Sequence, residues 1–217
     1  MTLAAPGAIF APQPYKEVPM RKCLLVLSLA ALLVPAWAAA QDLPAGIRGE
    51  IIASMKDAGG KLEELSAAVP DGKYTWKPSK DVRSVGQVYL HVVTANYRIP
   101  SYLGFQPPMS KDELIKLDSQ TMEPAKIRQM LKDSYVWAEK AVADIPDSDL
   151  DAPVEFFGMK WTKRSAILLL ASHSHEHLGQ SIAYARANNI VPPWTARELA
   201  EKKKKDAEKK SAEKTGK

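Results

Sequence analysis

The sequence predicts an all-α protein whose main domain is a four-helix bundle. Two observations lead to this prediction: four segments place apolar residues at helical spacing, and clusters of Pro, Gly and Asn separate these segments. The segments cover residues 43–69, 84–103, 123–143 and 162–188. Four helices of this length with mostly polar connections are typical of a bundle, in which inward side chains from facing helices build metal sites.

The first two helices have recognisable ends. Pro70-Asp71-Gly72 ends the first helix, and Gly59-Gly60 inside it predicts a kink, because each glycine lowers helix stability by roughly 1 kcal/mol relative to alanine. Ser84 with Gln87 three residues later predicts a capping box at the start of the second helix. The polar stretch from Pro107 to Asp118 predicts a loop.

The last two helices also carry start and stop signals. Pro124 lies in the first turn of the third helix. Residues 154–161 predict a short extended pair or a turn, and Thr162 is a suitable N-cap for the fourth helix. Asn188-Asn189 and the prolines that follow end it.

All four histidines lie in two of these helices. His173 and His177 are four residues apart, about 40° around the helix axis, so their rings share one face. His175 is about 200° from His173 and is expected at the surface or between helices. The pair together with His91 makes a three-nitrogen set that leaves positions open on a divalent metal, as catalytic sites do.

Three neighbours of the histidine pair have expected roles. Glu176 could hold an imidazole tautomer or simply face solvent, and the sequence leaves both open. Gln180, seven residues after His173, shares its face and could hydrogen-bond near the metal. Gly179 predicts close packing against a neighbouring helix, because glycine otherwise costs helix stability.

Residues 1–40 are expected to be a secretory signal peptide with a short extension before it. Met20-Arg21-Lys22 gives a basic start, an apolar run from Cys23 to Val34 follows, and Ala36 to Ala40 offers cleavage sites before Gln41. A single anchoring helix is the alternative. The sequence thus predicts three parts: the 1–40 leader, a bundle domain at 41–200 and a disordered Lys-rich tail at 201–217, for which partial helix is the alternative. The expected location is periplasmic or secreted, without stable membrane insertion after cleavage.

Charge and cysteine content exclude several functions. The net charge of +5 comes from the leader (+2) and the tail (+4), so the domain carries about −1 and lacks the basic footprint of a nucleic-acid-binding protein. The one cysteine, Cys23, lies in the leader. The mature domain therefore has no disulfide, thiolate ligand or cysteine nucleophile.

The motifs around the histidines resemble the DinB-like superfamily of four-helix-bundle metalloenzymes. The matching segments are Trp76-Lys77-Pro78, Val82 to Gln87, Leu90-His91-Val92, His173 to Gln180, Tyr184 to Arg186 and Ile190 to Pro193. The resemblance implies that His91, His173 and His177 bind a divalent metal. Some members of that family transfer low-molecular-weight thiols, others are linked to maleylpyruvate isomerisation or sulfoxide synthesis, and most have no known activity. Those thiols are cytosolic, which argues against thiol transfer by an exported chain.

The expected function is that of an exported metal-dependent enzyme, of hydrolase, isomerase or transferase type. A metal held by imidazoles with open positions activates water or polarises a carbonyl of a small-molecule substrate. The alternatives are a non-catalytic periplasmic metal- or ligand-binding module and a purely structural bundle. Three imidazoles suit zinc, nickel or iron(II). The sequence does not decide whether the protein forms a homodimer.

Overall fold

The computed structural model describes residues 45–215. The chain divides into two units, residues 1–42 and 43–217, and every described residue belongs to the second. The expected leader and its cleavage site before Gln41 lie outside the described residues.

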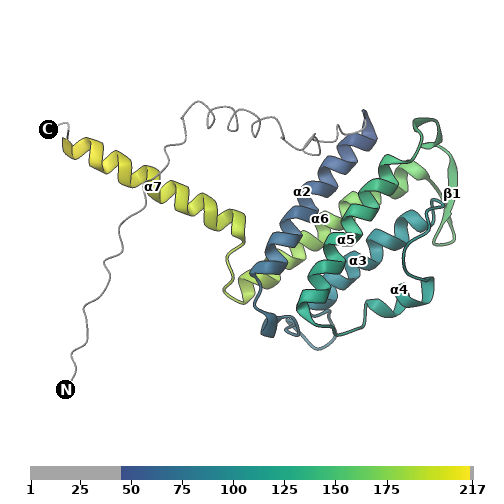
Figure 1. Ribbon diagram of the computed structural model, residues 1–217, viewed down its shortest axis with the longest axis horizontal. Coiled ribbons are helices and arrows are strands. Elements are labelled where there is room, and N and C mark those ends of the chain that lie inside the picture. The colour runs from purple at the N-terminus through teal and green to yellow at the C-terminus, as the bar shows by residue number, and fades with distance from the viewer. Residues whose placement is uncertain (1–44, 216–217) are drawn as a thin grey trace, which may run out of the picture. The chain divides into compact units, whose positions relative to one another are not determined.

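Four long helices form the predicted bundle: α2 (Ile47–Ala68), α3 (Val85–Ser101), α5 (Pro124–Ala143) and α6 (Lys163–Ala187). The main contacts join α2 to α5, α5 to α3, α3 to α6 and α6 to α2 (Figure 1). The consecutive helices α2 and α3 therefore occupy opposite corners. This order makes α3 and α6 neighbours, although they are far apart in the sequence.

Side-chain caps fix the starts of the two helices that carry the histidines. The Ser84 hydroxyl accepts from the Gln87 backbone N–H, while the Gln87 side chain accepts from the Ser84 backbone N–H, so the predicted capping box is confirmed. Thr162 caps α6 by accepting from the Ser165 backbone N–H.

A short helix replaces part of the predicted loop at 107–118. Helix α4 (Lys111–Leu117) starts with its own capping box between Ser110 and Glu113 and buries two leucines, Leu114 and Leu117. It packs on α3. The loop prediction was wrong here because the run is short and mostly polar, so burial on α3 rather than length stabilises it.

The connection before α6 is a two-stranded hairpin. Of the two expectations for residues 154–161, an extended pair or a turn, the extended pair is confirmed. Strands β1 (Pro153–Phe156) and β2 (Met159–Thr162) pair antiparallel. Phe157 and Gly158 form the turn and both have positive φ, which matches the right-handed twist of a two-residue hairpin. Two single-turn 3-10 helices, Asp71–Lys73 and Asp147–Asp149, complete the connections.

Close packing against a neighbouring helix occurs at Gly59 of α2 and not, as expected, at Gly179 of α6. Helix α2 continues through Gly59 and Gly60, and a Cβ at Gly59 would lie 2.8 Å from the ring of Tyr135 on α5. Gly59 thus allows close approach of α2 and α5. The expected close packing at Gly179 is wrong, since no atom lies within 4 Å of a Cβ placed there.

Helix α7 (Pro193–Thr215) includes most of the tail that was expected to be disordered. Its side chains from Ala196 to Glu213 are all exposed, and an ion pair between Arg197 and Glu64 joins its first half to α2. Lys, Glu and Ala are strong helix formers, which explains a helix without an apolar stripe. Among the described residues, no helix is long and apolar enough to cross a membrane.

Candidate metal centre

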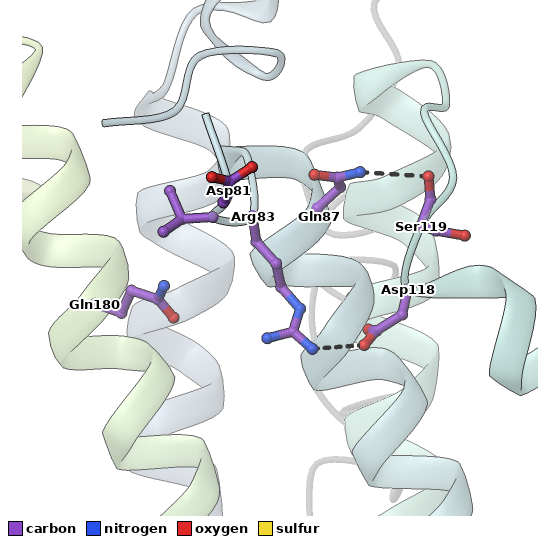
Figure 2. Close-up of a pocket in the computed structure, with 7 residues that line it drawn as sticks. Asp81, Arg83, Gln87, Asp118, Ser119 and Gln180 are labelled. Atoms are coloured by element: carbon purple, nitrogen blue, oxygen red, sulfur yellow. Dashed lines mark hydrogen bonds and ion pairs between the residues drawn. The ribbon is translucent and has the colours of Figure 1, made fainter. Parts of the chain in front are cut away.

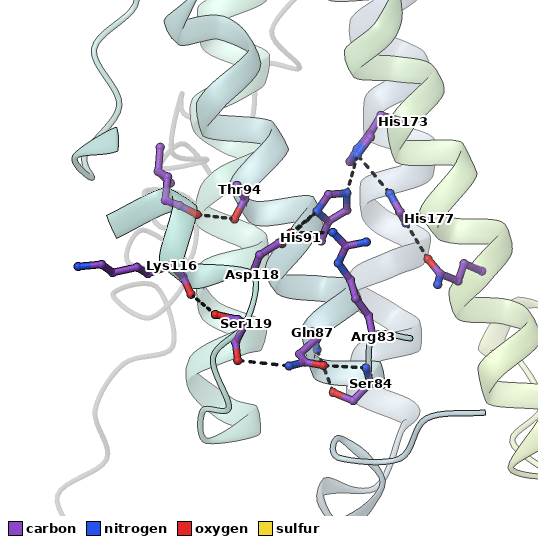
Figure 3. Close-up of polar contacts among 12 residues, drawn as sticks. Arg83, Ser84, Gln87, His91, Thr94, Lys116, Asp118, Ser119, His173 and His177 are labelled. Atoms are coloured by element: carbon purple, nitrogen blue, oxygen red, sulfur yellow. Dashed lines mark hydrogen bonds and ion pairs between the residues drawn. The ribbon is translucent and has the colours of Figure 1, made fainter. Parts of the chain in front are cut away.

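Three histidines converge between α3 and α6. The Nε2 atom of His173 lies 3.1 Å from Nε2 of His91 and 3.2 Å from Nε2 of His177 (Figure 3). His177 is buried, and His91 and His173 are partly buried. Among the described residues, these three make the one group of His, Cys, Asp or Glu side chains whose ligand atoms are close enough to hold a metal ion.

In two of the three rings, Nδ1, the nitrogen that does not face the cluster, is hydrogen-bonded to an acceptor. Nδ1 of His91 lies 2.8 and 3.0 Å from the two carboxylate oxygens of Asp118, and Nδ1 of His177 lies 2.8 Å from Oε1 of Gln180. Each Nδ1 therefore carries the proton, and each Nε2 presents a lone pair to the centre. Partners of this kind orient ligating imidazoles and raise their basicity.

The converging nitrogens fit a metal better than they fit each other. Nε2 of His173 can donate to only one of its two neighbours, so at least one of the two close contacts is not a hydrogen bond. With metal–nitrogen bonds of about 2.0–2.1 Å, ligand angles between 90° and tetrahedral place nitrogens about 2.8–3.4 Å apart. The two observed separations lie in this range.

The environment keeps the imidazoles of His173 and His177 neutral, as metal ligation requires. Burial, with the neighbouring His177 and His91, lowers the pKa of His173 to about 3. Burial also lowers the pKa of His177, although the hydrogen bond with Gln180 opposes this shift. The positive charge of Arg83 lowers the pKa of both rings further.

Asp118 links the histidine cluster to Arg83. Its Oδ2 accepts from Nη2 of Arg83 at 2.7 Å and from Nδ1 of His91. Burial alone would raise the pKa of Asp118, but the hydrogen bonds from His91 and Arg83 outweigh it and leave the pKa below its usual value. Asp118 is therefore a carboxylate that serves two donors at once.

An open pocket of about 530 Å³ lies beside the cluster. Asp118 and Gln180, which hold His91 and His177, both line it, as does Arg83 (Figure 2). Gln87 and Ser119 complete its polar wall through a hydrogen bond between them. The pocket gives solvent and small molecules access to the residues that hold the histidines.

The other three residues considered in the sequence analysis, His175, Glu176 and Gln180, have different places in the structure. His175 is exposed and bonds to Ser54 of α2, away from the cluster, and Gln180 holds His177 and also donates to the Tyr184 hydroxyl. Glu176 is exposed, and within residues 45–215 no hydrogen bond joins it to the three histidines. Of its two open roles, the structure favours solvent exposure, with only its charge acting on His177.

Two residues of the site were missed from the sequence, Asp118 and Arg83. Asp118 follows α4, and the Ser110–Glu113 capping box was the signal that a helix precedes it. Its contact with His91 spans 27 residues and depends on how α4 packs, which no local pattern reveals. Arg83 directly precedes the N-cap of α3.

A family model described as the DinB superfamily matches residues 55–181. The chain belongs to the DinB superfamily. This match covers α3, α5 and most of α6, including all three histidines. A search of curated proteins found no match.

Solved structures similar to this DinB chain support the same fold. A DinB-like protein from Bacillus cereus is 19% identical with a TM-score of 0.59, and the match covers 68% of this chain and 95% of that one. A DinB-like protein from Bacillus subtilis is 18% identical with a TM-score of 0.52, over 65% and 93% of the two chains. A conserved protein from Enterococcus faecalis is 13% identical with a TM-score of 0.57, over 66% and 97%.

Proposed function

We propose that this chain is an exported metal-dependent enzyme in which His91, His173 and His177 hold one divalent metal. The observation that carries the proposal is the convergence of the three rings: two Nε2–Nε2 separations suit a common ion, and the three ligand atoms all lie within 4.8 Å of one another. When bound, such a metal supplies Lewis acidity, which activates water or a small-molecule substrate for hydrolysis, isomerisation or group transfer. Zinc, nickel and iron(II) all suit three imidazoles.

The residues around the cluster support catalysis over simple metal storage. Asp118 and Gln180 hold the outer nitrogens of His91 and His177, so they orient these rings rather than add ligands. The cluster has three members within the described residues, which leaves coordination positions for water or substrate. The adjacent pocket is lined by Asp118 and Gln180, which hold two of the three rings. A non-catalytic binding module remains the second candidate, and a closed coordination sphere would favour it.

Metal content tests the ligand set directly. The wild-type protein is expected to bind one divalent ion per chain by elemental analysis, and His173→Ala is expected to lose most of it. His175→Ala is the matched control, because His175 lies on the same helix but bonds to Ser54. Loss of metal in His175→Ala with retention in His173→Ala would refute the assignment.

An open coordination position separates an enzyme from a binding module. Cobalt(II) can replace zinc in such sites, and its visible spectrum reports the coordination. Addition of imidazole to the cobalt-loaded protein is expected to give a saturable spectral change as it enters the open position. A spectrum that stays constant would indicate a closed site and favour the non-catalytic module.

Export is part of the proposal and rests on the basic and apolar pattern of residues 20–40. Protein recovered from the periplasm or medium is expected to start at or within two residues of Gln41. An N-terminus upstream of Cys23 on protein that stays in the cell would contradict it.

A further inference from the structure

Arg83 is a charged side chain of the pocket. Its hydrogen bond to Asp118, which orients His91, uses only part of its capacity to donate. Arg83 lies at the wall of the pocket beside the cluster, and its side chain is 41% exposed (Figure 2). A guanidinium has five N–H donors. One Nη2 group is bonded to Asp118, and no other acceptor among the described residues is bonded to the guanidinium. The remaining donors face solvent.

The pairing with Asp118 holds the guanidinium near the three histidines. Asp118 bonds to His91 and Arg83 through the same Oδ2 atom, so both donors meet at one carboxylate (Figure 3). The charge of Arg83 also acts on His173 and His177. A ligand in the pocket therefore lies beside the guanidinium and beside Asp118 and Gln180, which hold His91 and His177.

We propose that the pocket takes a small carboxylate-bearing substrate, whose carboxylate is bound by Arg83 beside the three-histidine cluster. This inference rests on the proposed metal site and adds the class of substrate to it. Arginine suits this role because its planar fork matches the two oxygens of a carboxylate. The tether to Asp118 holds the fork in place before the ligand arrives, which lowers the entropy lost on binding.

The charge of the pocket favours one carboxylate over a phosphate dianion. A divalent ion together with Arg83 exceeds the combined charge of Asp118 and Asp81 by one positive charge, and both acids line the pocket. Arg83 is the one cationic side chain of that lining. A monoanion would balance the site, whereas a dianion would leave negative charge beside Asp81.

The test measures binding of sodium acetate to the cobalt-loaded protein by isothermal titration calorimetry, which detects acetate wherever it binds. Wild type is expected to bind acetate with saturation, and more tightly than inorganic phosphate at the same pH. Arg83→Gln should weaken acetate binding by about tenfold to a hundredfold, the usual effect of losing a hydrogen bond to a charged group. Arg83→Lys keeps the charge without the fork and should lose less.

Two controls separate recognition of the carboxylate from damage to the site. Arg164→Gln is the matched variant, because Arg164 is 45% exposed and pairs with Asp151 at 2.9 Å, as Arg83 pairs with Asp118, but lies outside the pocket lining. It should bind acetate like wild type. Imidazole is a neutral ligand for the metal, and its affinity should stay the same in Arg83→Gln.

Each contrary outcome identifies which part of the proposal is wrong. Equal acetate affinity in wild type and Arg83→Gln would overturn the inference, as would an equal loss of imidazole affinity, which would show that Arg83 acts through Asp118 and His91. Tighter binding of phosphate than of acetate would overturn the carboxylate assignment. A wild-type protein that binds cobalt but not acetate would refute this inference alone. A wild-type protein that takes up no cobalt would refute the proposed metal site itself.

Discussion

The four-helix bundle and α7 are both helical, but different interactions stabilise them. Bundle helices bury apolar side chains against one another, such as Leu62, Leu131 and Leu170, all with 0% exposure. In α7 the side chains from Ala196 to Glu213 are exposed, Leu199 among them. Tertiary packing therefore holds the bundle, whereas local propensity and pairs such as Lys204 with Glu208 hold α7. Substitutions in the bundle should therefore change the free energy of unfolding through packing, whereas substitutions in α7 should change it little.

Truncation of one leucine in each region should give the largest contrast. Leu62→Ala should lower the free energy of unfolding by about 2–5 kcal/mol, because it leaves a cavity in the core. Leu199→Ala should change it by less than about 0.5 kcal/mol, since Leu199 is 50% exposed. Urea unfolding followed by circular dichroism measures both. Similar losses in the two variants would show that α7 is packed against a partner surface.

Two adjacent glycines sharpen the comparison within the bundle. Gly59→Ala should destabilise the protein by about 1–3 kcal/mol, because its Cβ would overlap the ring of Tyr135. Gly60→Ala has open space around it and should stabilise the protein by up to about 1 kcal/mol through helix propensity. Thermal unfolding of both variants measures the difference. The same sign of change in both would contradict the close approach of α2 and α5.

Acid should weaken the bundle at the histidine cluster. His173 titrates near 3 in the folded protein and near 6.5 when unfolded, so the unfolded chain binds more protons between these values. Stability of the metal-free protein should therefore fall as the pH drops below about 6.5, by at most about 1.4 kcal/mol per pH unit for this group. Urea midpoints from pH 7 to 4.5 should show a shallower slope for His173→Gln than for wild type. An equal slope would mean that His173 is not held neutral.

Removal of residues 201–217 should have the smallest effect. The described side chains of this segment, 201–213, are all exposed, and the Arg197–Glu64 pair stays. The midpoint of thermal unfolding should stay within about 2 °C of the full chain. A larger drop would show that this part of α7 does contact the bundle.

Local signals in the sequence predicted most of the bundle. Ser84 with Gln87 and Thr162 before α6 mark helix starts through contacts three residues away, and these contacts can be inferred from spacing. The shared face of His173 and His177 follows from helix geometry in the same way.

The parts that were missed depend on packing between distant segments. Gly59 gave the same local signal as Gly60, and only the ring of Tyr135 distinguishes them. Helical spacing could not identify Asp118, because α4 must fold against α3 before the Asp118 carboxylate meets His91. The sequence thus predicted the clustering of the histidines more readily than the residues that orient them.

The adjacency of α3 and α6 has a consequence for the order of folding. His91 and His173 are 82 residues apart, so the cluster forms only after α5 and α6 have been made and α6 has docked. Closing a loop of this length costs entropy that only the final packing recovers. An unfolded or nascent chain offers at most the His173–His177 pair, a weak chelator. With the proposed metal site, uptake of the ion would therefore be coupled to the last step of assembly, in the compartment where the chain completes its folding.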